Sequence, residues 1–199
     1  METEKRSRVD TFVTVVAVIM SLYHLYTCIF GIPESQMHRM LHLMFASILT
    51  FSIYNFRGKK NDGKLHFADI LFIAATIASL TYMIWNLKVF QNRITFVTPL
   101  TTVQIVVFIL LLLTVLETTR RLTGWTLPIV SIVFLLYALF GQHLPGVLAH
   151  TGSSPEKILE QVVLTSEGIF GSSLGITATY VVVFIIFASF LEVTGAGQF

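Results

Sequence analysis

The sequence predicts an all-α, polytopic membrane protein, and three observations support this fold class. Apolar residues make up 54% of the chain and charged residues 12%, about half the charged share of an ordinary soluble domain. The apolar residues gather into about six segments, each near the length that crosses roughly 30 Å of hydrocarbon as a helix. Polar connections separate these segments. The apolar segments are residues 11–30, 37–56, 67–85, 101–116, 126–141 and 174–191.

The first segment follows a short charged stretch, as the apolar core of a signal peptide would. Its apolar run extends beyond the roughly 7 to 15 residues of such a core, and no small-residue cleavage site closes it. We therefore expect a retained membrane helix. The single cysteine, Cys28, lies inside this segment, so an intrachain disulfide is excluded.

The basic residues predict the orientation of the segments. If the first segment runs outward, most of the Lys and Arg residues fall on the inner side, so the positive-inside rule makes the N-terminus cytoplasmic. The charges are spread over several loops, and the net charge of +2 therefore does not indicate a nucleic-acid partner. The inner set is Lys5, Arg6, Arg8, Arg57, Lys59, Lys60, Lys64, Arg120 and Arg121, and the outer set is Arg39, Lys88, Arg93 and Lys157.

The second segment begins with two histidines that are candidate metal ligands. His38 and His42 are four residues apart and share a helix face, but no carboxylate or cysteine joins them at ligand spacing. We expect them instead to lie near lipid headgroups. His24 joins them only if the first two segments pack side by side.

Polar residues near the ends of the middle segments have predictable structural roles. Asp69, at the start of the third segment, is placed to interact with the positive end of the helix dipole. Residues 86–100 mix apolar and basic side chains, as a strip along the outer surface would. Residues 116–121 carry enough charge to have left the hydrocarbon, and Pro128 falls in the first turn of the fifth segment, where a missing N–H costs little.

The connection to the last segment contains a clear helix start. Ser154 can act as the N-cap, with Pro155 at the first helical position and Glu156 in the first turn. The following residues place Ile158, Leu159, Val162 and Val163 on one face, and Glu160 and Gln161 on the other.

Residues 168–179 are rich in Gly, Ser and Thr, although they precede a strongly apolar run. Irregular backbone at membrane depth requires protein or a water-filled cavity around it, which makes this stretch a candidate ion or substrate site. Alternatively, the small residues only allow close helix packing. Two arrangements are open: a re-entrant hairpin whose second arm is the last apolar segment, or an interfacial helix before an ordinary span.

In combination, several motifs resemble the N-terminal part of the fused permease subunit of tripartite ATP-independent periplasmic (TRAP) transporters, in the branch that pairs with the TAXI type of substrate-binding protein. They cover nearly the whole chain and are most specific from residue 116 onward. The motifs are YHLYT (23–27), HR (38–39), HL (42–43), LETTRR (116–121), LPIV (127–130), LLYALFG (135–141), HLPG (143–146), LAH (148–150), TSEGIFG (165–171), FLE (190–192) and GAG (195–197).

The resemblance implies a multi-pass permease component in a bacterial or archaeal inner (plasma) membrane. It would belong to a symporter that uses sodium as coupling ion, without other cofactors, to take up an organic anion of the carboxylate type from a periplasmic substrate-binding protein. Residues 1–123 would be the small four-helix domain, and residues 124–199 the beginning of the large elevator-type domain. The family's large domain continues for several hundred residues, so we expect this chain to be a fragment or to have a partner that supplies the remainder.

The resemblance also implies functional residues. The first hairpin tip of the large domain would line the sodium and substrate region, where backbone carbonyls and hydroxyls supply hard oxygen ligands. Outer segments would help to dock the binding protein, with Lys88 and Arg93 as candidate contacts. The candidate ion and substrate residues are Gly171, Ser172, Ser173, Gly175 and Thr177.

Two alternatives come from other functional classes. One is a structural or accessory membrane subunit without transport activity of its own, which would form a stable complex with a larger permease. The other is a membrane-embedded, metal-dependent enzyme, for which His24, His38 and His42 would be the only chemical cluster. The segments contain no Ser–His or Asp–Asp pair suited to catalysis, so we expect no enzyme activity.

Overall fold

The computed structural model describes residues 7–61 and 63–196, which form helices joined by turns. Two short 3-10 helices, η1 (Gly141–His143) and η2 (Gly146–Leu148), follow α6, and a π-helical stretch, η3 (Thr177–Val181), joins α8 to α9. The predicted all-α fold class is confirmed. The α-helices are α1 (Arg8–Phe30), α2 (Ser35–Ile53), α3 (Phe67–Trp85), α4 (Leu87–Gln91), α5 (Thr102–Thr123), α6 (Thr126–Phe140), α7 (Pro155–Val163), α8 (Ser172–Ile176) and α9 (Val182–Thr194).

All six predicted apolar segments form helices, and five of these are long and apolar enough to cross a membrane. The five are α1, α3, α5, α6 with η1, and the continuous helix from α8 to α9. The chain is therefore a membrane-embedded protein. The remaining segment, α2, has 19 residues but buries several polar side chains, and neighbouring helices surround it.

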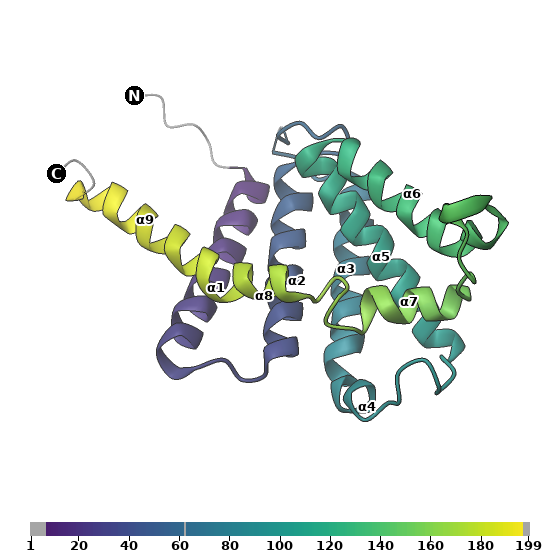
Figure 1. The fold of residues 1–199 in the computed structure, drawn as a ribbon. Helices are drawn as coiled ribbons and strands as arrows, with labels where there is room; N and C mark the ends of the chain where they lie inside the picture. Colours follow the sequence, from purple (N-terminus) through teal and green to yellow (C-terminus); the bar gives the residue numbers. More distant parts are fainter. Residues whose placement is uncertain (1–6, 62, 197–199) are drawn as a thin grey trace.

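The helices α1, α2, α3 and α5 stand side by side as a bundle (Figure 1), in which α2 packs against the other three. A core of buried residues fills the space between α2, α3 and α5, and the turn before α8 contributes Phe170 to it. Residues after Gly124 thus complete the bundle's packing. The fully buried members of this core include Met40, Leu80, Met83, Phe108 and Leu111.

The helices α7 and α8 follow one another across the side of the bundle (Figure 1), with α7 against α5 and α6 and α8 against α2. The two arms of the predicted hairpin therefore do not pack against each other. The continuous helix then crosses α1 and extends away from the bundle as α9. This arrangement places the polar turn between α7 and α8 against the side of α2.

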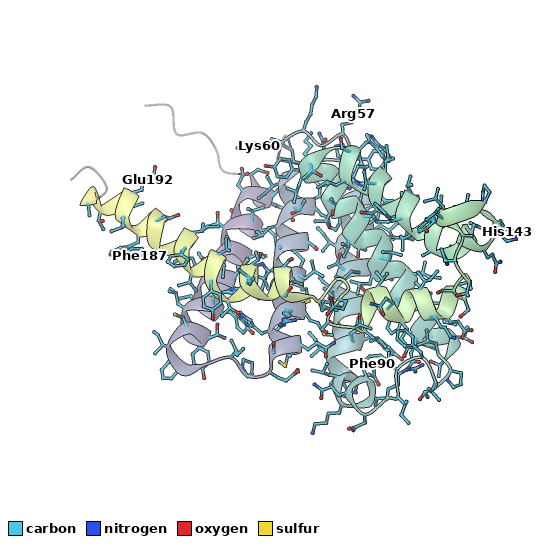
Figure 2. The ribbon with its side chains drawn as sticks, in the orientation of Figure 1. Arg57, Lys60, Phe90, His143, Phe187 and Glu192 are labelled. Atoms are coloured by element: carbon cyan, nitrogen blue, oxygen red, sulfur yellow. The ribbon has the colours of Figure 1, made fainter. Side chains whose placement is uncertain are left out.

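One end of the bundle carries the basic loop, which contains Arg57, Lys59, Lys60 and Lys64. Figure 2 shows Arg57 and Lys60 at one end, and Phe90 of α4 at the other. At the basic end, the Ser7 hydroxyl caps α1 and donates to the carbonyl of Gly63 at 2.5 Å. The sequence-based grouping of Arg8 with the second basic stretch at one end agrees with this arrangement, whereas Lys5 and Arg6 lie outside the described residues.

The two arginines at the end of α5, which were predicted to lie outside the hydrocarbon, are buried within the protein. Arg121 is buried and donates to Asp69 at 2.6 Å and to Glu117 at 2.8 Å. It also donates to the carbonyl of Tyr54 at 2.8 Å. Asp69 still caps α3 as predicted, because its carboxylate accepts from the backbone N–H of His66 at 3.0 Å. The Asp69 carboxylate thus joins α3 to α5, and Arg121 joins both to the end of α2 at Tyr54.

Replacing Asp69 with asparagine should destabilise the bundle. Both side chains of the Asp69–Arg121 pair are fully buried, and the loss of one partner from such a pair typically costs about 3 kcal/mol. Without the charge of Asp69, Arg120 and Arg121 would share the single carboxylate of Glu117. Unfolding of Asp69→Asn in detergent should show this decrease in the free energy of unfolding. Glu192→Gln, at an exposed position, is the control and should leave stability unchanged; equal stability of the two variants would contradict the prediction.

Candidate functional site

The turn between α7 and α8 is built by its own backbone hydrogen bonds. As predicted, α7 begins with Ser154 as N-cap and Pro155 in its first turn. After α7 the chain folds back, because the N–H of Ile169 donates to the carbonyl of Val162 at 2.7 Å. Phe170 then enters the core and leaves 1% of its surface exposed. The start of α8 is thereby fixed relative to the bundle.

Gly171 is one of the predicted ion-site residues. A glycine is needed here because a side chain would clash with neighbouring atoms, and not because the backbone conformation demands it. It is the N-cap of α8 with φ −73°, a conformation that any residue can adopt. A Cβ atom here would lie 2.9 Å from the carbonyl oxygen of Gly168 and 3.0 Å from that of Ser166. The tight turn therefore has no room for a side chain at this position.

Arg39 of α2 holds the turn in place. Its guanidinium donates to the carbonyl of Phe170 at 2.7 Å and lies against Gly175, where a Cβ atom would come within 2.8 Å of the arginine Nε. This contact was not predicted from the sequence. The available signal was a cation inside a predicted membrane segment with no acidic residue at helical spacing.

His38 binds the π-helical stretch. Its Nε2 lies 3.1 Å from the carbonyl oxygen of Ala178, and its Nδ1 lies 3.0 Å from the hydroxyl of Tyr23. A carbonyl only accepts, so Nε2 carries the hydrogen, and in the neutral ring Nδ1 accepts from the tyrosine. π-helical turns within α-helices are often found at functional sites.

The prediction that the histidines lie near lipid headgroups is wrong. His24, His38 and His42 are all buried, because α1 and α2 pack side by side and η3 covers them. His24 donates through Nδ1 to the carbonyl of Met20 at 2.7 Å, and its Nε2 lies 3.0 Å from Nδ1 of His42. Because α1 and α2 pack side by side, His24 joins His38 and His42, as the sequence allowed.

The histidine cluster is a hydrogen-bonded network. Five of its six ring nitrogens are within 3.1 Å of a partner in the protein. Within residues 7–61 and 63–196, no three side chains of His, Cys, Asp or Glu are arranged to hold a metal ion. The geometry therefore gives no support to His38 and His42 as metal ligands.

The predicted ion-site residues fall on two sides of the helix. Gly171 is buried and Gly175 lies against Arg39, whereas Ser172, Ser173 and Thr177 are exposed. Thr177 donates to the carbonyl of Ser173 at 2.9 Å. The two serine hydroxyls have no hydrogen-bond partner among the described residues. Gly171 therefore lies against the turn's own backbone and Gly175 against Arg39, whereas the two serine hydroxyls are free to bind a ligand.

Of the two predicted docking residues, only Lys88 is exposed. Arg93 donates to Glu160 at 3.0 Å, and their side chains are 7% and 4% exposed. Glu160, predicted on the polar face of α7, is instead buried because residues 92–100 fold over it, and it also accepts from the N–H of Phe96 at 3.1 Å. Arg93 therefore offers no free charge to a docking partner.

Comparisons with known proteins identify no relative of this chain. No family model matches it, and neither a curated protein nor a solved structure does. The resemblance to a permease subunit stays a prediction from the motifs.

Replacing Gly171 with alanine should loosen the turn. The new methyl group would meet two backbone carbonyl oxygens that cannot move aside, and overpacking of this kind costs about 1 to 3 kcal/mol. Ser173→Ala, two residues away at an exposed position, is the matched control. Limited proteolysis in detergent should show faster cleavage within residues 164–171 for Gly171→Ala alone, and equal rates in both variants would contradict the steric argument.

Proposed function

We propose that this protein is the permease component of a sodium-driven secondary transporter that takes up an organic anion of the carboxylate type. The observation that supports the proposal is the position of the Gly-Ser segment, which consists of the turn before α8 and the first residues of α8. It lies against the side of a bundle of membrane helices and exposes two serine hydroxyls. Hydroxyl and carbonyl oxygens beside a broken or widened helix are the ligands that membrane transporters use for alkali cations.

The motif resemblance adds the remaining parts of the proposal. It supports a TRAP-type permease of the TAXI branch in an inner (plasma) membrane, with a periplasmic binding protein and the remainder of a large permease domain as partners. Because Arg93 is buried, Lys88 is the remaining predicted contact for the binding protein. It lies at the end of the bundle opposite the basic loop.

A structural or accessory subunit is the second candidate, and one observation favours it. Gly175 and Ala178 both face α2, where they contact Arg39 and His38. Close packing alone would explain small residues at these two positions. It does not explain the exposed hydroxyls of Ser172 and Ser173, which make no packing contact of this kind.

The sodium dependence of uptake distinguishes the two candidates. If the hydroxyls bind sodium, Ser172→Ala and Ser173→Ala in the permease expressed with its binding protein should raise the sodium concentration for half-maximal uptake several-fold, because each removes one oxygen ligand. Expression should be unchanged, since both side chains are exposed. Thr165→Ala, in the turn before the site, is the control. Wild-type sodium dependence in both serine variants would favour the accessory subunit.

The proposed orientation places the basic loop in the cytoplasm and Lys88 outside. In a Cys28→Ala background, a membrane-impermeant thiol reagent added to intact cells should label Lys88→Cys and leave Lys60→Cys unlabelled, because Lys60 lies in the basic loop. Both positions are exposed, so each should react once the membrane is permeabilised. Labelling of Lys60→Cys in intact cells would reverse the orientation.

A further inference from the structure

A polar pocket of about 300 Å³ lies between the start of α2 and the helix formed by α8 and η3. Arg39 lines it together with the hydroxyl-bearing residues Ser35, Ser172 and Thr179, and none of the residues that line it is acidic. The pocket therefore offers one positive charge and several hydroxyl groups, which is a donor set for an anion.

The charge of Arg39 has no counterion among the described residues. Arg93, Arg120 and Arg121 each lie within 3.0 Å of a carboxylate, whereas Arg39 makes a single hydrogen bond, to the carbonyl of Phe170. An arginine within a membrane-embedded bundle is costly unless it is paired or reaches water. Four of its five N–H groups are left to bind another molecule.

An apolar groove of about 350 Å³ adjoins the polar pocket and shares Ile32, Thr179 and Tyr180 with it. The groove runs between the end of α1, at Thr27 and Cys28, and the start of α9. A site with a cationic polar end and an apolar continuation fits an amphiphile with an anionic head. In a membrane, phospholipids are the abundant molecules of this kind.

We propose that the pocket and the groove together bind one phospholipid with a net negative headgroup. The phosphate accepts hydrogen bonds from Arg39 and from the hydroxyls of Ser35 and Thr179, and an acyl chain lies in the groove between α1 and α9. A zwitterionic headgroup would bring an amine into a pocket without a carboxylate to pair with it. The bound lipid would supply the missing counterion of Arg39, whichever transport function the protein has.

The proposal can be tested by native mass spectrometry of the full chain from nanodiscs that contain phosphatidylglycerol or phosphatidylcholine. The wild-type protein should retain phosphatidylglycerol preferentially. Arg39→Gln should reduce this retention about fivefold or more, as expected for the loss of one basic contact. Lys88→Gln removes an exposed charge from α4, which lies at the same end of the bundle, and should retain as much lipid as the wild type.

A second variant separates lipid binding from the structural role of Arg39. Cys28→Trp fills the apolar groove and leaves Arg39 and its bond to Phe170 untouched, so it too should lose phosphatidylglycerol. Undiminished retention in Cys28→Trp, or equal retention of the two lipids by the wild type, would overturn the proposal. Inorganic phosphate alone is the third probe: if it raises the melting temperature in detergent through Arg39 while no lipid is retained, the ligand is a free anion.

Discussion

A polar helix in the middle of a membrane bundle is the constraint on which the arrangement of the other helices depends. α2 carries the buried side chains of His38, His42, Ser47, Thr50 and Ser52, and such groups cannot face hydrocarbon without hydrogen-bond partners. It is therefore enclosed by α1, α3 and α5, and by the helix from α8 to η3 on the side where the histidines lie. The histidines themselves then bind backbone carbonyls and each other.

This constraint explains which features could be predicted from the sequence. Local patterns were sufficient for the apolar segments, for the N-cap at Ser154 and for the role of Asp69, because each depends on residues within one helical turn. The buried pairs were not predictable in this way. Arg93 and Glu160 are 67 residues apart, and Arg121 and Asp69 are 52 residues apart, so each charge taken alone resembled a residue at the membrane surface.

In the candidate site, too, one part could be predicted from local sequence and another part depends on tertiary packing. The Gly-Ser stretch was correctly recognised as unusual, but the sequence offered packing and ion binding as alternatives for all of its residues together. In the structure the two explanations apply to different faces. Gly171 and Gly175 are limited by close contacts with protein atoms, and Ser172 and Ser173 are exposed. Which face a residue occupies depends on how the helix of α8 and η3 packs against α2. Arg39 and His38 fix that packing, and both lie on α2, far from this stretch in the sequence.

These contacts also bear on how a transporter built in this way could move. In an elevator-type permease the domain that carries the substrate shifts relative to its scaffold, yet here the turn is tied to the bundle through Arg39 to Phe170 and His38 to Ala178. Two such hydrogen bonds contribute only about 1 to 4 kcal/mol together, which is within the range that differential ligand binding can supply. If this protein is a permease of that type, as we propose, either these bonds break in each transport cycle, or residues up to Val181 belong to the scaffold. In the second case the moving part begins in α9, which extends away from the bundle with most of its apolar surface uncovered.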